Sequence, residues 1–198
     1  MIAGSKRRTL PLFPLNTLVF PGGRLPLRIF EQRYLDMVKQ AIADNSPFGI
    51  CAIRAGSEVG APATPYEIGT RVIVTDWDMP QTGILHIDTQ AQERFVIRST
   101  HSEPNGLLIG TVEPVSVEVI APIPDDLQLA AEILRHIVKE YGDAHFPAPH
   151  HFDDAVWVGY RLSEVLPLKL SIKQNLLEMN DSVERLRILS EILKKQIN

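Results

Sequence analysis

Histidine and aspartate residues gather in one segment of the sequence, residues 145–154 (HFPAPHHFDD). Its candidate ligands are His145, His150, His151, Asp153 and Asp154. Because imidazole and carboxylate groups bind zinc, a metal-dependent hydrolase that uses this cluster is one hypothesis. The spacing matches no standard zinc motif, however, and Pro147 and Pro149 indicate a loop between helices. We therefore expect a solvated polar loop, with no bound metal and no other cofactor.

The residues that commonly act as nucleophiles lack the neighbours that catalysis requires. Cys51 lies in the apolar run FGICAI, where a free cysteine usually serves as a small buried hydrophobe. The chain contains no Gly-Lys pair, which excludes the GxxxxGK[ST] phosphate loop, and it has no GxSxG-like serine. We expect no catalytic residue and no enzymatic activity.

A second set of polar residues, near the first helix, could contact a ligand. Gln32, Arg33 and Asp36 occupy the helix face opposite the apolar positions, and Arg28 precedes them in a strand. They could form a polar rim beside an apolar lip, which consists of Phe20, Pro21 and Leu25. Alternatively, Arg28 forms a structural ion pair with Glu31 or with another carboxylate. The sequence leaves both possibilities open.

The first part of the chain has the pattern of a β domain. Short apolar segments bounded by turn residues predict strands in 10–29, 48–53, 70–77, 84–99 and 107–119, with 84–99 forming either a hairpin or one bulged strand. Prolines in 10–29 and Pro114 remove backbone donors, which indicates edge or bulged strands. One helix is predicted over 30–44. A small closed or half-closed barrel would leave few strand edges unpaired.

The hydrophobic period changes to 3.6 residues after the segment 121–124 (APIP). Four helices are predicted, over 125–142, 153–166, 171–180 and from 181 onwards. Ser171 with Gln174, and Asp181 with Glu184, have the spacing of capping boxes. The expected fold class is therefore α+β: a β-barrel domain over residues 1–120 with one embedded helix, followed by an all-α helical bundle over 121–198.

Composition argues against several functions. The 198 residues have a formal charge of −4, so a dedicated nucleic-acid binder with a basic face is not expected. The triplet Lys6-Arg7-Arg8 would supply only weak, salt-sensitive affinity for RNA. One cysteine cannot form an internal disulfide, and no apolar run is long enough for a membrane helix. A cytoplasmic protein without membrane partners is the default expectation.

Four blocks of residues 10–37, in the order LPLFPL, FPG, LPLRIFE and RYLDM, resemble the N-terminal, substrate-binding domain family of the ATP-dependent Lon protease. Residues 171–189 (SIKQNLLEMNDSVERLRIL) are similar to the helical subdomain of that family. The resemblance implies a PUA-like β fold with one embedded helix. It also implies a stand-alone, non-catalytic domain that binds unfolded or degron-bearing polypeptide, or a protein partner, because the ATPase and protease motifs are missing. An RNA-binding PUA-like protein is the alternative.

Overall fold

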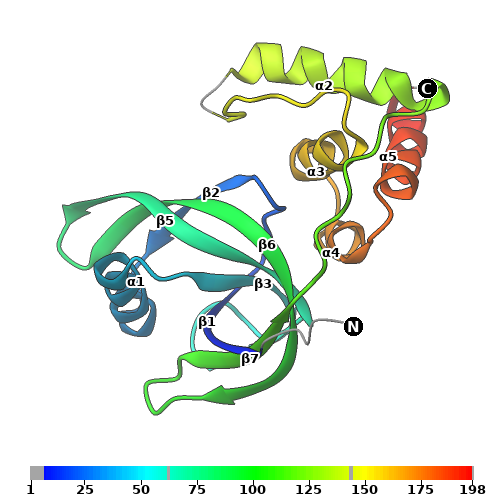
Figure 1. Cartoon of the computed structure of the whole chain (residues 1–198). Helices are drawn as coiled ribbons and strands as arrows, with labels where there is room; N and C mark the ends of the chain where they lie inside the picture. Colours follow the sequence, from blue (N-terminus) through cyan, green and yellow to red (C-terminus); the bar gives the residue numbers. More distant parts are fainter. Residues whose placement is uncertain (1–6, 62, 143–144, 198) are drawn as a thin grey trace. The chain divides into compact units, whose positions relative to one another are not determined.

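The computed structural model describes residues 7–61, 63–142 and 145–197. It divides into two compact units, residues 1–116 and 117–198. Among these described residues, the first unit contains every β-strand and one α-helix, whereas the second contains four α-helices and a short 3-10 helix (Figure 1). The α+β class expected from the sequence is confirmed. Among the described residues, no helix has the length and hydropathy needed to cross a membrane.

The strands of the first unit close into a ring. They are β1 (Arg8–Leu15), β2 (Arg24–Ile29), β3 (Phe48–Ala55), β4 (Thr64–Pro65), β5 (Ile68–Gln81), β6 (Ile84–Ser102) and β7 (Leu108–Pro114). The strand order is β1-β7-β6-β5-β3-β4, and β2 pairs with β6. Parallel pairing between β1 and β3 joins the two sides, so five strands enclose an interior.

Strand β1 contains two prolines but is not an edge strand. Each proline lies where β1 pairs with a neighbouring strand on one side only. Pro11 lies in the half that pairs with β7, and Pro14 lies in the half that pairs with β3. Because only Leu12 is paired on both sides, each proline has one side without a ladder partner. The expectation of an edge was therefore wrong for β1. It is confirmed for β2, which pairs only with β6 in the described part of the unit.

The segment predicted as either a hairpin or one bulged strand is a single strand, β6. Its register against β5 shifts between Thr70 and Val72, where three residues of β6 span two of β5. The shift turns Phe95 to the face opposite that of Ala91. It therefore lets one strand contribute to two different cores.

The interior of the ring is small and apolar. Six buried side chains from four strands form its cluster: Leu10, Leu12, Cys51, Phe95, Leu108 and Val112. Gly49, Gly69 and Gly110 face the same space, and a Cβ atom at Gly69 would lie 2.6 Å from the carbonyl oxygen of Ile50. The close approach of the strands therefore depends on residues without side chains.

A larger cluster joins α1 (Gln32–Asp44) and β2 to the opposite face of the strands. Phe13 of β1 stacks on Tyr34 of α1 with ring centroids 4.0 Å apart. The helix begins two residues later than predicted, and Glu31 occupies its N-cap position without a capping hydrogen bond. Instead, the Glu31 carboxylate pairs with Arg33 at 3.0 Å. Asn45, with φ of 48°, ends the helix.

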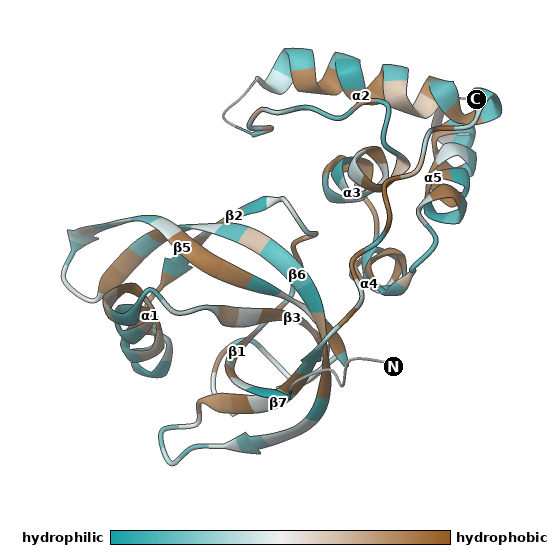
Figure 2. Cartoon of the chain, viewed as in Figure 1, coloured by the Kyte–Doolittle hydropathy of each residue, from teal (hydrophilic) through white to brown (hydrophobic). Residues whose placement is uncertain are grey.

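The second unit contains α2 (Gln128–Tyr141), α3 (Ala155–Val165), α4 (Leu170–Glu178) and α5 (Ser182–Ile197). Helix α3 contacts the other three helices. Hydrophobic and hydrophilic residues recur along α2 (Figure 2), as the predicted amphipathic helix requires. Asp181 caps α5, because its Oδ1 accepts a hydrogen bond from the Glu184 amide at 2.9 Å. The capping box predicted for Ser171 and Gln174 is wrong: α4 already includes Ser171, and Gln174 is buried.

A buried ion pair lies in the core of the helical unit. Arg185 of α5 is fully buried, and its guanidinium contacts the Glu118 carboxylate at 2.6 Å. The same side chain donates hydrogen bonds to the carbonyl oxygens of Leu176 and Met179 and lies over the ring of Tyr160. One arginine thus links the segment before α2 with α3, α4 and α5.

Candidate functional site

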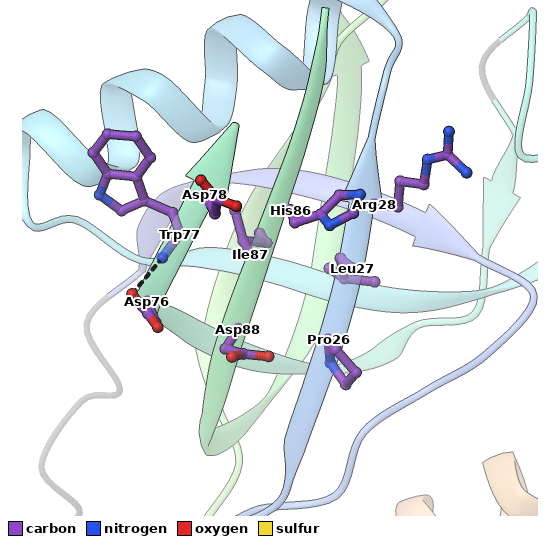
Figure 3. A pocket seen from close by; sticks show the side chains of 9 residues that line it. All are labelled: Pro26, Leu27, Arg28, Asp76, Trp77, Asp78, His86, Ile87 and Asp88. Atoms are coloured by element: carbon purple, nitrogen blue, oxygen red, sulfur yellow. Dashed lines mark hydrogen bonds between the residues drawn. The ribbon is translucent and has the colours of Figure 1, made fainter. Parts of the chain in front are cut away.

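A hollow of about 410 Å³ lies on the sheet where β2, β6 and β5 run side by side. Three consecutive residues of each strand line it (Figure 3). The lining residues are Pro26, Leu27 and Arg28 of β2, Asp76, Trp77 and Asp78 of β5, and His86, Ile87 and Asp88 of β6. They form three rows across the strands, because Asp76, Trp77 and Asp78 face Asp88, Ile87 and His86 in the ladder.

The rows alternate between the core and the open face of the sheet. The middle row points toward the core, where Ile87 is buried and Leu27 packs against the cluster of α1. The two outer rows lie on the open face, and all six of their residues are exposed: Pro26, Arg28, Asp76, Asp78, His86 and Asp88. Three aspartates and one arginine give this face a formal charge of −2 with His86 neutral.

The charges of the open face are not used by the fold. Within the described parts of the chain, the side chains of Arg28, Asp78 and Asp88 form no ion pair and no hydrogen bond with another residue. Asp76 accepts a hydrogen bond from the Trp77 amide at 2.9 Å, the contact drawn in Figure 3. Because these groups lie in water, they can exchange solvent for the polar groups of a ligand.

Trp77 stands in the core-facing row but is 54% exposed. It lies near the end of β5, in the β5–β6 hairpin, and Met79, two residues further on, is also exposed. An exposed tryptophan beside polar groups is typical of a recognition surface, because its ring provides large contact area with few rotatable bonds.

A second, smaller hollow of about 60 Å³ adjoins the first. Arg28 lines both hollows. The exposed side chains of Phe30 and Val59 border the smaller one, which Phe13 and Tyr34 also line. Burial raises the pKa of Tyr34 above its ordinary value. The surface along β2 therefore passes from an apolar hollow, over Arg28, to an acidic face.

The structure separates the residues that the sequence suggested as a rim and a lip. Phe20 is fully buried and Arg33 is 7% exposed, so in this structure neither side chain can reach a ligand. Arg33 instead pairs with Glu31 and donates to the Gly106 carbonyl oxygen at 3.1 Å. Gln32 and Asp36 are exposed and bond to each other at 2.7 Å.

Pro21 and Leu25 are partly buried, whereas Arg28 is exposed and lines both hollows. The structural alternative for Arg28 was a pair with Glu31 or with another carboxylate, but Glu31 contacts Arg33, and the Arg28 side chain forms no ion pair with another described residue. Of the seven suggested residues, only Arg28 lines the two hollows.

Sequence reasoning missed Trp77 and the three aspartates around it. The strand predicted over 70–77 ended at Trp77, and no exposed face was assigned to it. Exposure of an aromatic residue on a strand depends on whether another element covers it, which one sequence does not show.

The histidine-rich segment forms a cluster of rings. His150 Nε2 donates a hydrogen bond to the Phe146 carbonyl oxygen, 2.7 Å away, and the His150 ring lies 5.8 Å from that of Trp157. The imidazole of His151 meets Trp157 edge-on, and His145 lies beside Tyr141. Residues 143 and 144 lie outside the described residues. Within the described ranges, no group of three or more His, Cys, Asp or Glu residues is placed to hold a metal ion.

Cys51 is buried, and Arg7 of the basic triplet forms an ion pair within the barrel unit. Burial raises the pKa of the Cys51 thiol far above its ordinary value, which disfavours the reactive thiolate. Arg7 pairs with Glu113 at 2.9 Å. The six residues that precede it, including Lys6, lie outside the described residues.

Comparison with known proteins identifies relatives of the whole chain. A family model described as the ATP-dependent protease La (LON) substrate-binding domain matches residues 9–195. The Lon protease of Cytophaga hutchinsonii is 26% identical over 197 residues, which cover 95% of this chain and 24% of that protein. The Lon protease of Anaeromyxobacter dehalogenans is 23% identical, with 94% and 23% covered. The chain thus spans about a quarter of the length of these curated relatives.

Solved structures share the fold. The crystal structure of a Lon N-terminal domain protein from Xanthomonas campestris is 32% identical, with a TM-score of 0.78 over 93% of this chain and 98% of that one. The N-terminal domain of Lon protease from the Mycobacterium avium complex, 19% identical, has a TM-score of 0.65 over 93% and 97%. The second likeness concerns the fold alone.

Proposed function

Because this chain belongs to the family of LON substrate-binding domains, we propose that it recognises extended polypeptide segments and holds them without acting on them chemically. Unfolded or degron-bearing chains are the proposed ligands. The observation that carries the proposal is the continuous surface along β2, where two hollows meet at Arg28. Neither hollow contains a paired nucleophile and base.

The geometry of β2 favours an extended ligand. Its outer edge is unpaired in the described part of the unit, and such an edge can accept another strand. Pro26 removes one donor from the middle of that edge, so side-chain contacts must supply much of the affinity. An extended segment that follows β2 passes the apolar hollow and then the acidic face in succession.

The chemistry of the surface indicates which side chains would bind. Phe30 and Val59 offer apolar contacts at one end. At the other end, the three aspartates attract basic groups, and the ring of Trp77 can stack on a side chain or a cation. Segments that combine apolar and basic residues should therefore bind most tightly.

Replacing the exposed aromatic residues of this surface tests the proposal. We expect the double variant Trp77→Ala, Phe30→Ala to lose about 10-fold in affinity for a fluorescein-labelled unfolded protein, because exposed aromatic anchors dominate such contacts. Fluorescence anisotropy measures the affinity, and circular dichroism verifies that the variant is folded.

A matched control lies in the helical unit. Leu129 and Tyr141 have comparable exposure, 52% and 60%. The double variant Leu129→Ala, Tyr141→Ala should therefore bind like the unchanged protein. If this control lost affinity and the surface variant did not, the site on β2 would be wrong. If the unchanged protein bound no unfolded polypeptide at all, the proposed function itself would fail.

A further inference from the structure

A third hollow, of about 250 Å³, lies apart from the surface along β2. Its lining comes from every strand of the closed ring or from the residue next to it: Arg8, Thr9 and Leu10 of β1, Val112 and Pro114 of β7, Glu93 and Phe95 of β6, Arg71 of β5, and Pro47 before β3. A hollow that five neighbouring strands surround is the mouth of their barrel. The mouths of β-barrels are frequent ligand sites.

Strand alternation explains the composition of this mouth. Arg8 lies two residues before Leu10 and four before Leu12, so all three side chains face the interior of the ring. In the same way, Glu93 shares the face of Phe95, and Arg71 shares that of Gly69. The interior is therefore apolar at its floor and charged at its rim.

The floor closes the hollow. Leu10, Phe95 and Val112 are each at most 5% exposed and belong to the packed interior cluster. A polypeptide cannot pass through such a blind hollow, but one apolar side chain can enter it. The floor therefore selects a single apolar residue rather than an extended segment.

The rim has an excess of positive charge. Arg71 pairs with Glu93 at 2.8 Å and also donates to Gln92 at 3.0 Å. Arg8 is exposed, and its side chain forms no ion pair or hydrogen bond with any other described residue. Two guanidinium groups and one carboxylate leave a formal charge of +1, which is complementary to an anion held just above the apolar floor.

We propose that the barrel mouth binds the C-terminal residue of a polypeptide that ends in a large apolar side chain. Such a residue carries an apolar group and a carboxylate on one carbon atom, as the floor and rim together require. The side chain enters the mouth, and the terminal carboxylate contacts Arg8. This inference rests on the proposed function, because it adds a second class of polypeptide recognition to the surface along β2.

Three probes test the inference with the full chain: a labelled twelve-residue peptide that ends in leucine with a free carboxylate, its C-terminal amide, and N-acetyl-leucine as a competitor. We expect the acid to bind about 10-fold more tightly than the amide, since a charged hydrogen bond is lost on amidation. The amide resonances of Gly49, Gly110 and Val112 should shift in ¹H–¹⁵N spectra when the acid binds.

The variant Arg8→Gln should abolish the preference for the acid. Arg7→Gln is its matched control, because it removes the same charge one residue away, on the opposite face of β1, where Arg7 contacts Glu113. Equal affinity for acid and amide in the unchanged protein would overturn the inference. So would an equal effect of both variants, or a failure of N-acetyl-leucine to compete, since it carries both groups that the mouth is proposed to bind.

Failure of this inference is separable from failure of the proposed function. If the amidated peptides and unfolded proteins still bind and depend on Trp77 and Phe30, the surface along β2 stands and only the terminal site falls. If neither kind of ligand binds, the proposed function falls as well.

Discussion

The strand ring and the helical unit differ in the kind of side chain at their centres. Apolar side chains and close-packed glycines fill the interior of the strand ring. The helical unit closes around Arg185, which is fully buried and paired with Glu118. Five strands that pair in a ring satisfy their backbone groups through one another. Short helices joined by turns leave carbonyl groups free at their ends, and Arg185 reaches two of these.

This difference shows where the chain can bind other molecules. In the helical unit, the buried Arg185 and Glu118 pair with each other, and Arg185 also donates hydrogen bonds to backbone carbonyl groups. In the barrel unit, the interior cluster of the strand ring is apolar, and the side chains of Arg8, Arg28, Asp78 and Asp88 lie at the surface without partners among the described residues. Groups that the fold does not need are free to contact a ligand. For these charged residues, the comparison therefore predicts large effects of substitution on stability in the helical unit and mainly effects on binding in the barrel unit.

Removing the buried arginine should have the largest effect. We expect Arg185→Met to lower the free energy of unfolding of the helical unit by about 3–5 kcal/mol, because Glu118 is left as a buried charge without its cation. The chain has two tryptophans, so Trp157 alone reports on this unit in a Trp77→Phe background. Urea unfolding followed by its fluorescence measures the change.

Arg187→Met is the matched control for this experiment. Arg187 lies two residues further along α5, about half exposed, and contacts Asp126 at 3.1 Å. An exposed pair of this kind contributes at most about 1 kcal/mol. Adding Glu118→Gln to Arg185→Met should restore part of the lost stability. Equal losses in the buried and exposed variants would refute the structural role of the pair.

A glycine-to-alanine substitution in each unit gives the second contrast. A Cβ atom at Gly69 would lie 2.6 Å from a backbone oxygen and 2.8 Å from the Cys51 sulfur. We therefore expect Gly69→Ala to destabilise the barrel unit by about 3 kcal/mol. Trp77 fluorescence in a Trp157→Phe background measures this unit.

Gly159 of α3 should tolerate the same change. Its nearest neighbour would be the flexible Arg185 side chain at 3.3 Å, and alanine favours a helix over glycine by about 1 kcal/mol. We expect Gly159→Ala to alter stability by less than about 1 kcal/mol, because the two effects oppose each other. A large loss at Gly159 with none at Gly69 would contradict the account of the two cores.

The fold was more predictable than the site for a physical reason. Hydrophobic period located α1 and all four helices of the second unit to within a few residues, since each buries one face. The hydrophobic period does not determine how deeply a side chain is buried, however. Phe20 and Arg33 fell on plausible faces, yet both are covered by neighbours distant in sequence. Trp77 was missed for the converse reason, because it is 54% exposed although it stands in the core-facing row.

Local rules failed where tertiary contacts competed with them. Ser171 and Gln174 have the spacing of a capping box, but Gln174 is buried and bonds to Glu178 at 2.8 Å. The helix therefore starts at Leu170 instead. Arg8 was read as part of a basic terminus, and only the closure of the ring reveals that it faces the barrel mouth. Side-chain direction became informative once the strand register was known.

Neutralising the open face along β2 should change binding but not folding. We expect Asp78→Asn, Asp88→Asn to weaken binding of basic unfolded polypeptides about 3-fold at low salt, with the difference shrinking as salt is added. Stability should stay within about 0.5 kcal/mol, because these groups have no partners to lose. Asp125→Asn, Asp153→Asn removes the same charge from the helical unit as the control. Equal weakening by both pairs would indicate a non-specific charge effect.

The smallest expected effect is the pH dependence at Glu113, on the outside of the barrel. Hydrogen bonds from Arg7 and Arg98 hold the pKa of its carboxyl below the ordinary value. A carboxyl whose pKa is lowered by folding adds stability above its unfolded pKa, and this contribution disappears as the pH falls through the folded value. The unchanged protein should therefore be slightly more stable than Glu113→Gln at neutral pH and equal to it in acid.

Carbon-detected NMR titration of the Glu113 carboxyl gives the more direct measurement. The double variant Arg7→Gln, Arg98→Gln should raise the pKa of Glu113 toward its ordinary value. An unchanged pKa in that variant would show that these two arginines do not hold the carboxylate, and their contacts with Glu113 would then contribute nothing electrostatic to folding.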